Sequence, residues 1–462
     1  SAASDVYKRQ GIFSYLDMQY APRDTTAACD TLDVTMQATF AKPLDAELEL
    51  NVVTKSNDQT GPGASFGVTR NNVFGGGESW NVKLKGSYEW QTGGGEKSSL
   101  MNSWEMGLST SLTFPRVVFP HLGKREFDFP ATTTFRLYIN QLNRAKYYKL
   151  LSFGGNATYD FQPSRTSRHS ITPFKLTFNV LQHQSAEFKE IAEANPALYV
   201  SLRNQFIPAM EYTYTYDNAS VRRIKNPIWW QSTVTSAGNI TSLIYRAFGK
   251  PFNEEDKSLL GAPFAQFVKL NTELRHLWNI DKNNAIASRV AVGALFTYGN
   301  ATIAPYSEQF YVGGANSIRA FTVRSVGPGG YHPEEGKYSY LDQTGTFRFE
   351  ANVEYRFRIF KSFWGATFLD AGNVWLLRKD RKLLADGKEA RPDSQLRLKT
   401  FPKQIALGTG VGIRYDMDIL VFRLDFGIPL HLPYDTNRSG YYNVTGAFFK
   451  NLGIHFAIGY PF

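Results

Sequence analysis

One arginine, Arg319, is distinguished by its surroundings, the stretch YVGGANSIRAFTVRSVGPGGY over 311–331. Bulky Ile318 and Phe321 lie close to it, and most of the stretch is otherwise glycine, small residues and proline. A guanidinium needs acceptors for its N–H groups, and its planar shape suits bidentate pairing with a carboxylate. We therefore expect Arg319 to anchor a segment that has little intrinsic structure of its own.

Side chains suited to catalysis or metal binding form no working pattern. The chain has one cysteine, Cys29, which excludes an intramolecular disulfide and a cysteine zinc cluster. No G-x-S-x-G, phosphate loop, zinc spacing or nucleotide fingerprint occurs. The histidines stand apart from any Ser/Asp pattern, and they are His121, His169, His183, His276, His332, His431 and His455. We expect His455 to fill an interior, and we predict no catalytic residue, no metal and no cofactor.

The composition leaves several kinds of protein open. The formal net charge is +10, from 51 Lys+Arg and 41 Asp+Glu. This balance suits a partner rich in phosphate, such as nucleic acid or lipid head groups, or simply a soluble basic surface. Aromatic residues make up 15% of the chain, and they favour strands and membrane-interface belts. No run of about 18 apolar residues occurs that could form a transmembrane helix.

Alternation of apolar and polar residues is the main structural signal. In FRFEANVEYRFRI (347–359), Val353 and Tyr355 share one face, whereas Glu350 and Glu354 share the other. Similar patterns occur in WNVKLKGSYEW (80–90) and in LGIHFAIGYPF (452–462). A soluble sandwich gives the same alternation in a single strand. A closed barrel, however, crosses a membrane with strands of about 9–11 such residues.

Counted along the chain, the alternation predicts sixteen strands, an even number, as bacterial barrels require. We place them at 47–56, 63–72, 79–91, 104–114, 132–143, 146–161, 168–181, 205–217, 228–240, 263–276, 284–298, 345–359, 363–377, 404–416, 419–430 and 450–462. The connections after strands 11, 13 and 15 are long, and those after strands 12 and 14 are short, as expected of outer loops and periplasmic turns. The stretch 115–131 is an exception, because it is long for a periplasmic turn.

Two connections have a character of their own. Residues 185–198, SAEFKEIAEANPAL, have helical spacing, and we expect a short helix on an outer loop. Residues 377–403 are rich in Lys and Arg. For them we expect either a solvated loop or a contact with anionic lipid head groups.

Several motifs together resemble the BamA/TamA superfamily of outer-membrane assembly barrels: GGANSIRAF (313–321) in a long loop, FLDAGNVW (368–375) after it, and an aromatic last residue. RNNVFGGGESW (70–80) is similar to that family's turn after strand 2. The ending IGYPF and the helix-bearing loop are most similar to TamL-type lipoprotein relatives of Bacteroidota. The family signature is (V/I)RG(F/Y) at the tip of a sixth extracellular loop that folds into the barrel. Ile318, Arg319 and Phe321 fit it, and Ala320 replaces its glycine.

The resemblance implies a fold and a division of the chain. The fold would be all-β, a sixteen-stranded transmembrane antiparallel β-barrel with an inward-folded sixth extracellular loop, preceded by the remnant of a POTRA domain. Residues 43–462 would form the barrel, and residues 11–42 the C-terminal part of the last POTRA domain. Residues 1–10, SAASDVYKRQ, match nothing that follows in style, and we expect a cloning or sequencing scar there.

The resemblance also implies the site. The loop-six motif would comprise Gly313, Gly314, Ile318, Arg319, Ala320 and Phe321, and its arginine would pair with lumen acids at Glu354 and Asp370. The working seam would be the closure between the first and last strands, where a client strand can pair by β-augmentation. Seam and C-terminal assembly signal would include Phe456, Ile458, Tyr460 and Phe462. Pro461 lacks an N–H, which would weaken the seam or simply end the strand.

Strand 404–416 adds a physical reason for an inward loop. Its inward set includes Gly408, Gly410 and Gly412, and glycine inside a strand is unfavourable unless another backbone lies close. We expect these three glycines to face the loop. The alternative is a lumen wall of small residues left for water.

These features predict a barrel in the bacterial outer membrane that assembles, inserts or translocates other proteins. Its partners would be outer-membrane lipids including lipopolysaccharide, client outer-membrane or secreted proteins, and a periplasmic or inner-membrane protein reached through POTRA domains. We expect no nucleic acid. Two alternatives stay open: a two-partner-secretion-type export pore and, from another class, a barrel enzyme such as a phospholipase or protease.

Overall fold

The structure is a computed structural model. It describes residues 13–23, 31–40, 42–54, 59–91, 103–118, 131–144, 148–186, 189, 204–219, 224–252, 257–259, 262–299, 305–333, 343–379, 391–417, 420–438, 440–446, 448 and 451–462. In this part of the chain, no helix is both long enough and apolar enough to cross a membrane.

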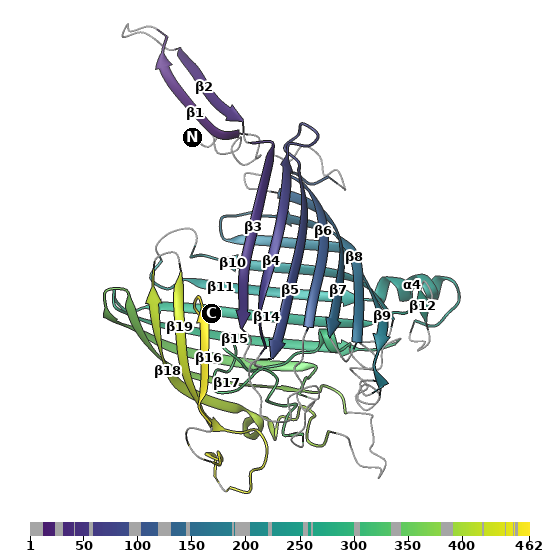
Figure 1. Cartoon of the computed structure of the whole chain (residues 1–462), viewed down its shortest axis with the longest axis vertical. Coiled ribbons are helices and arrows are strands. Elements are labelled where there is room, and N and C mark those ends of the chain that lie inside the picture. The colour runs from purple at the N-terminus through teal and green to yellow at the C-terminus, as the bar shows by residue number, and fades with distance from the viewer. Residues whose placement is uncertain are drawn as a thin grey trace.

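The central element is one curved sheet of sixteen strands, and each strand pairs antiparallel with its neighbours (Figure 1). In chain order they are β3 (Leu44–Thr54), β4 (Gln59–Asn71), β5 (Ser79–Gln91), β6 (Ser103–Phe114), β7 (Ala131–Arg144), β8 (Tyr148–Phe161), β9 (Ser167–Gln184), β10 (Gln205–Asp217), β11 (Ile228–Ala237), β14 (Phe267–Asn279), β15 (Asn284–Thr297), β16 (Phe347–Phe360), β17 (Phe363–Trp375), β18 (Ala406–Asp416), β19 (Val421–His431) and β20 (Gly453–Ile458). The predicted sixteen-stranded barrel fold is confirmed, and each predicted strand lies within a few residues of an observed one.

The alternation along the strands is inverted relative to a soluble sandwich. In β16, Glu350 and Glu354 are buried, at 1% and 0% exposure, whereas the apolar Val353 on the other face is 48% exposed. The same inversion occurs in β19, where Asp425 is buried. A sandwich would bury its apolar face and leave the charged face in water. The barrel therefore has a polar interior and an apolar outer surface, which removes the ambiguity that single strands left open.

The two ends of the barrel differ in their connections. At one end, which we call the turn end, β16 and β17 are joined by 361–362, and β18 and β19 by 417–420. At the other end, the loop end, the connections span 298–346, 376–405 and 432–452. Their described residues include the short 3-10 helices η1 (Tyr306–Glu308) and η3 (Phe401–Gln404). We call residues 298–346, between β15 and β16, loop six.

The first and last strands are the ends of the strand order. β3 has 11 residues and β20 has 6, and no ladder joins them within the described ranges. β20 pairs with β19 from Phe422↔Ile458 to Gly427↔Gly453. The predicted last strand, 450–462, is therefore too long at both ends.

Three further features differ from the sequence-based expectations or lie outside them. The predicted strand 228–240 ends at Ala237, and α4 (Asn239–Ala247) follows, with a small hairpin of β12 (Ser258–Leu259) and β13 (Ala262–Pro263) before the next long strand. The predicted helix 185–198 falls almost wholly outside the described residues, as does 380–390 of the basic connection. β1 (Phe13–Pro22) and β2 (Leu32–Phe40) form a separate hairpin beyond the turn end (Figure 1).

Candidate functional site

Loop six enters the barrel and packs against its interior. Val312 and Ile318 are fully buried, and Phe321 is 8% exposed, in a cluster that includes Phe267 and Leu295 of the wall. The tip is a tight turn, in which Gly314 N–H donates to the carbonyl of Phe321 over 2.8 Å. Gly313 has φ +103°, and a Cβ there would lie 2.0 Å from the Thr322 carbonyl. Only glycine fits that position, so the turn that presents Arg319 depends on it.

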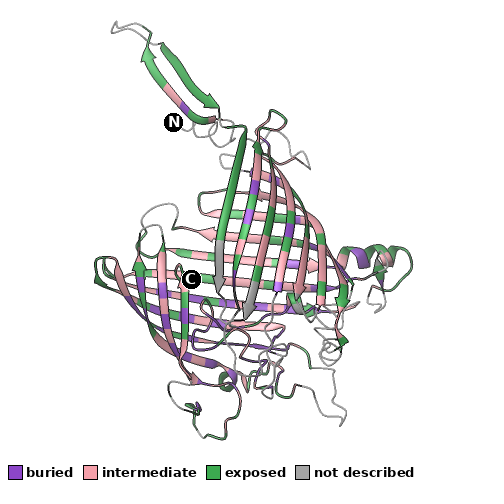
Figure 2. Cartoon of the chain, viewed as in Figure 1, coloured by how far each residue is buried: buried purple, intermediate pink, exposed green. Residues whose placement is uncertain are grey.

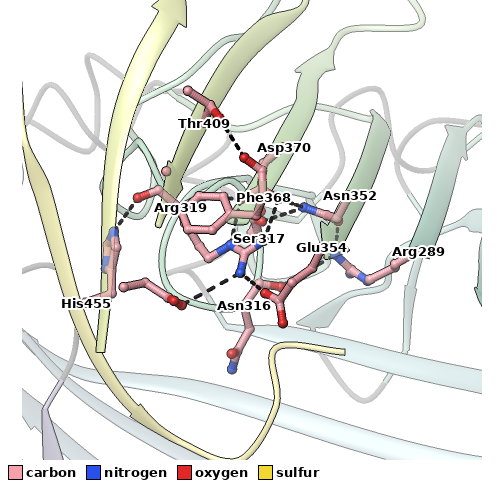
Figure 3. A network of polar contacts seen from close by, with 12 residues as sticks. Arg289, Asn316, Ser317, Arg319, Asn352, Glu354, Phe368, Asp370, Thr409 and His455 are labelled. Carbon is pink, nitrogen blue, oxygen red and sulfur yellow. Dashed lines mark hydrogen bonds and ion pairs between the residues drawn. The ribbon is translucent and has the colours of Figure 1, made fainter. Parts of the chain in front are cut away.

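Arg319 is fully buried and bonded to both of the acids named above (Figure 3). Its Nε and Nη2 donate to the two carboxylate oxygens of Asp370, over 2.8 and 2.9 Å, and its backbone N–H donates to Asp370 Oδ2 over 3.0 Å. Nη1 donates to Glu354 Oε2. Bidentate pairing fixes the direction of the guanidinium as well as its charge. Both acids come from neighbouring strands, β16 and β17.

Neutral groups complete the surroundings of Arg319. The ring of Phe368 lies under the guanidinium, 3.6 Å from ring centroid to Cζ. His455 Nε2, on β20, donates to the Arg319 carbonyl over 2.7 Å. Asn352 Nδ2 donates both to Asp370 Oδ1, over 2.9 Å, and to the Ser317 carbonyl, over 2.8 Å. The loop tip is therefore held by groups from three strands, including the last one.

A second layer of ions lies behind Arg319. Arg414 Nη2 donates to Glu354 Oε2 over 3.0 Å, and its Nη1 lies 2.5 Å from Asp425 Oδ1. Arg423 Nε lies 3.5 Å from Asp425 Oδ2, and Arg319 Nη1 lies 3.7 Å from the same oxygen. All of these side chains are at most 1% exposed. Such charges tolerate burial only because each has an opposite charge beside it.

A third group ties the base of the tip to β15 and β16. Arg289 Nη1 donates to Glu350 Oε2 over 3.2 Å and to Asn352 Oδ1 over 3.1 Å. Its Nη2 donates to Glu273 Oε2 over 3.1 Å. Ser317 Oγ donates to Glu350 Oε2 over 2.6 Å and accepts the Gly313 N–H. The network is continuous from the loop turn to the wall, and we call it the lumen cluster. Its members are Glu273, Arg289, Ser317, Arg319, Glu350, Asn352, Glu354, Asp370, Arg414, Arg423, Asp425 and His455.

The loop tip lies on a row of glycines that only partly matches the predicted one. A Cβ on Gly408 would lie 2.3 Å from the Ala320 Cβ, and one on Gly427 would lie 2.6 Å from the Arg319 carbonyl oxygen. A Cβ on Gly453 would lie 3.2 Å from the same oxygen. The glycines expected at 410 and 412 do not face the loop: a Cβ there would meet Phe368 at 2.5 Å and Arg414 at 2.3 Å. Gly410 and Gly412 therefore make room for the side chains of Phe368 and Arg414, which surround Arg319. The loop tip crosses β18, β19 and β20 at Gly408, Gly427 and Gly453, and does not run along β18.

Ala320 fits the site because of Gly408. Its methyl lies against Gly408 of β18, which has no side chain to oppose it. Phe321 packs into the apolar cluster at the tip.

The C-terminal residues leave the outer face of the barrel. Ile454, Phe456 and Ile458 are exposed on it, as expected. Gly459 then has φ +88°, and the alternation stops. Arg356, on the polar face of β16, lies 4.2 Å from the Tyr460 ring centroid and 5.8 Å from that of Phe462. The two aromatics predicted to continue the strand are therefore turned toward a lumen arginine.

Sequence reasoning missed most of the second and third layers. The alternation along 404–416, 419–430 and 452–462 predicts that Arg414, Arg423, Asp425 and His455 lie on polar faces, but it does not assign them to the site. The register between β18 and β19 brings these side chains together, because Arg414 is opposite Arg423 and Gly412 is opposite Asp425. Inward charges on consecutive strands near a motif arginine are the signal that would have found them.

Comparisons with known proteins agree with this architecture. Residues 72–462 match the Omp85 superfamily domain. The structure of BamA from Haemophilus ducreyi lacking POTRA domains 1-3 aligns with a TM-score of 0.63 at 14% identity, over 99% of this chain and 76% of that chain. CdiB from Acinetobacter baumannii aligns with a TM-score of 0.51 at 12% identity, over 98% of this chain and 66% of that one. At these identities the structural likeness shows the fold, and the domain match shows the family. The chain belongs to the Omp85 superfamily.

Proposed function

We propose that this chain is the barrel of a protein that inserts other proteins into the bacterial outer membrane, or moves them across it. The family and the apolar outer surface support the membrane location. On this proposal the loop end faces the cell exterior and the turn end the periplasm. Client outer-membrane or secreted proteins would be its substrates, and outer-membrane lipids including lipopolysaccharide would surround it.

The observation that carries the proposal is the unequal pair of end strands. β20 offers a ladder of 6 residues to a β3 of 11 residues, so any closure between them leaves part of β3 unpaired. An unpaired strand edge is a template for another strand. A client strand that pairs with β3 would enter the membrane at this seam.

The lumen cluster gives the last strand a second support. His455 on β20 donates to the Arg319 carbonyl, and Gly453 lies beneath the same carbonyl. We propose that loop six holds β20 in place through the motif arginine, so that the seam between β20 and β3 can open without β20 detaching from the barrel. Arg319, Glu354 and Asp370 would then be positioning residues for the seam.

The segment before the barrel fits the same assignment. We propose that 11–42, with the β1–β2 hairpin, is the C-terminal part of a POTRA domain that approaches a periplasmic or inner-membrane partner. The hairpin exposes Tyr15, Tyr20 and Phe40, at 52%, 54% and 73%. Exposed apolar side chains of this kind favour the view that the hairpin packs against other parts of a larger domain.

A disulfide lock across the seam tests the proposal. Cysteines would be placed in β3 at Leu48 or Leu50 and in β20 at Ile454 or Phe456, in a Cys29→Ser background. The protein would be reconstituted in liposomes, and insertion of a urea-unfolded outer-membrane protein would be followed. We expect oxidation to lower insertion to the rate of empty liposomes, and reduction to restore it.

A matched control uses two cysteines at Val353 and Leu369, which face each other on β16 and β17. Oxidation of this pair should leave insertion unchanged, because it links strands that already form a ladder. Full insertion by a crosslinked seam would overturn the proposal, and so would failure of crosslinking in every register.

An export pore is the second candidate, and a polar hollow in the lumen favours it. The hollow has a volume of about 520 Å³ between the wall and loop six, and Lys175, Glu211, Lys269 and Glu308 line it. A chain moving through the lumen would pass such groups, and a seam lock would leave it unaffected. Export that survives the oxidised seam would therefore favour this candidate over insertion.

A barrel enzyme has less support. Glu354, Asp370 and Asp425 are each held by one or more arginines. A general base must lie within hydrogen-bond reach of its substrate, and all three carboxylates are fully buried in the lumen cluster. The cluster is built to hold charge in place, which suits an anchor.

A further inference from the structure

The segment 238–264 leaves the barrel wall at the loop end and folds over its outside. The turn begins at Gly238, which has φ +70° and donates its N–H to the Pro208 carbonyl over 2.7 Å. A Cβ there would lie 2.2 Å from the Ala265 carbonyl oxygen. The chain must therefore have glycine at this point to turn sideways. In Figure 1 the segment projects from the side of the barrel next to β9.

Contacts with outward-facing aromatics show which side of the wall it covers. Phe206 shares a face of β10 with Met210 and Tyr212, which are 37% and 39% exposed on the outer surface. Phe206 itself is 8% exposed, because Phe264 pairs with it and both pack with Phe178 of β9. The segment thus lies on the apolar outer surface, and does not cover the lumen.

The helix of this segment, α4, has three distinct faces. The first contains Thr241, Ser242 and Tyr245: the first two are buried, and Tyr245 packs near Phe264, 6.1 Å between ring centroids. Lys257, which is 1% exposed, donates to Ser242 Oγ over 3.0 Å from beneath. This face fixes the helix to the barrel.

The second face is apolar and exposed. Ile240, Leu243 and Ile244 are 48%, 55% and 52% exposed, and Phe248 just beyond the helix is 85% exposed. Their spacing of three and four residues places them on one stripe of a helix. A helix at a water-exposed surface turns such a stripe toward the protein core, and here the core-facing side is already occupied by the first face. Figure 2 shows the helix largely exposed.

The third face is polar and contains Arg246, which is exposed. Asn239 belongs to the fixed side instead, since it donates to Ser236 Oγ over 2.8 Å and accepts from the Tyr298 hydroxyl over 2.8 Å. At 3.6 residues per turn, Arg246 lies around the helix axis between Ser242 of the fixed face and Leu243 of the apolar stripe. A helix with one side fixed to a wall, one apolar side and one polar side has the arrangement of an interfacial helix beside a membrane protein. The apolar side then points into acyl chains and the polar side toward head groups and water.

We propose that α4 is a lipid-binding element, which lies in the outer leaflet against the barrel and inserts Ile240, Leu243, Ile244 and Phe248 among lipid acyl chains. The occupant is lipid because the stripe continues the exposed apolar outer surface that includes Phe174, at 65%, and Met210. Arg246 and Lys250, which are exposed at the end of the helix, suit the phosphates of anionic head groups. The inference rests on the membrane location proposed above.

Site-directed spin labelling of the protein in liposomes tests it. Single cysteines in a Cys29→Ser background would be labelled at Leu243, Ile244 and Arg246, with Phe174 as a reference on the barrel's outer face. Collision with oxygen, which concentrates in lipid, would be compared with collision with a water-soluble nickel chelate. We expect labels at 243 and 244 to favour oxygen as the label at 174 does, and the label at 246 to favour nickel.

Each other outcome overturns the proposal. Nickel-accessible labels at 243 and 244 would mean that the stripe faces water. Labels protected from both reagents would mean that protein covers it, from a second copy or another partner. The label at 174 separates this failure from failure of the membrane location, because only the latter would make position 174 accessible to nickel as well.

Discussion

Both halves of the barrel wall contain ion pairs, but those of the C-terminal half are buried and the pair described in the N-terminal half is exposed. In the C-terminal wall, β14 to β20, the pairs Arg319–Asp370 and Arg414–Asp425 are fully buried under loop six. In the N-terminal wall, β3 to β9, Lys85 and Glu105 form a pair at 2.6 Å but keep 55% and 33% exposure. Figure 2 shows the same contrast, with buried residues concentrated in β16 to β19.

The difference shows that burial by the loop, and not the presence of charge, makes the C-terminal wall a structural site. An exposed pair contributes roughly 0–1 kcal/mol, because water and salt screen it. Removing one member of a buried pair costs roughly 3–5 kcal/mol, because its partner is left charged without compensation. The buried pairs therefore fix the C-terminal wall to loop six, and the exposed pair of Lys85 and Glu105 places no such constraint on the N-terminal wall.

The largest effect is expected for Arg319→Ala, which breaks the contrast at its strongest point. It leaves Asp370 and Glu354 buried beside one cation fewer, so we expect a loss of roughly 3–5 kcal/mol in the free energy of unfolding. The measurement is unfolding of the barrel in detergent by heat and by urea. Arg324→Ala is the control in the same loop, because Arg324 lies over the Tyr311 ring, at 4.5 Å, and outside the lumen cluster. Equal losses in the two variants would remove the special role of Arg319.

The next effect is a steric one at the loop tip. Gly408→Ala places a methyl where the Ala320 methyl already lies, and overpacking of this kind costs roughly 1–3 kcal/mol. Ala320→Gly removes the opposing methyl, so the double variant should recover most of the lost stability. A thermodynamic cycle of the two single variants and the double variant measures the coupling. Additive effects would mean that the tip does not rest on β18 at this point.

The sequence predicts those features of this site that depend on residues close together in the chain, and it does not predict those that depend on contacts between distant strands. The alternation along each strand is local, and it correctly predicts that Glu350 and Glu354 share a polar face of β16. The choice of partner is not local, because it depends on strand register and on where the loop tip crosses the wall. Gly410 and Gly412 illustrate this: a stripe of glycines on one strand resembles a loop track, yet the tip crosses from Gly408 to Gly427.

The end of the chain teaches the same point. The alternation of LGIHFAIGYPF continues to the last residue, so a strand to Phe462 is the natural prediction. A left-handed Gly459 and the cationic Arg356 redirect Tyr460 and Phe462, and neither influence can be read from a period of two. Likewise, the alternation does not predict α4, because its nine residues directly follow a strong strand pattern and Gly238 alone marks the change of direction.

A smaller effect sharpens the comparison at the turn end of the N-terminal wall, where Glu78 is a buried acid. It is 2% exposed, accepts the Gly76 N–H over 2.9 Å and accepts from Arg116 Nη2 over 2.7 Å. Burial alone would raise the pKa of Glu78, but these hydrogen bonds outweigh it and hold the pKa below its ordinary value. Arg116 is the second residue of the long connection 115–130, so the pair links this connection to the turn between β4 and β5.

The sign of the pH effect follows from that direction. A lowered pKa in the folded state means that Glu78 stabilises the fold fully above its ordinary pKa, and that this contribution is lost as pH falls through the folded value. We expect the melting temperatures of the native protein and Glu78→Gln to differ by a constant amount near neutral pH. The gap should narrow below the ordinary glutamate pKa. Glu105→Gln, which alters an exposed pair, is the control, and a gap for Glu78→Gln that does not change with pH would contradict the assignment.

The smallest effect is expected where the comparison predicts almost none, at the exposed pair of Lys85 and Glu105. Lys85→Met, Glu105→Gln and the double variant form a cycle whose coupling energy should be below about 1 kcal/mol and should shrink further in high salt. The matched cycle on Arg319 and Asp370 should give a coupling several times larger that salt hardly changes, since loop six excludes water from it. A large, salt-insensitive coupling at Lys85 would mean that something covers the N-terminal wall as well. The contrast between the two walls would then reflect what occupies the lumen, and loop six would be only one of its occupants.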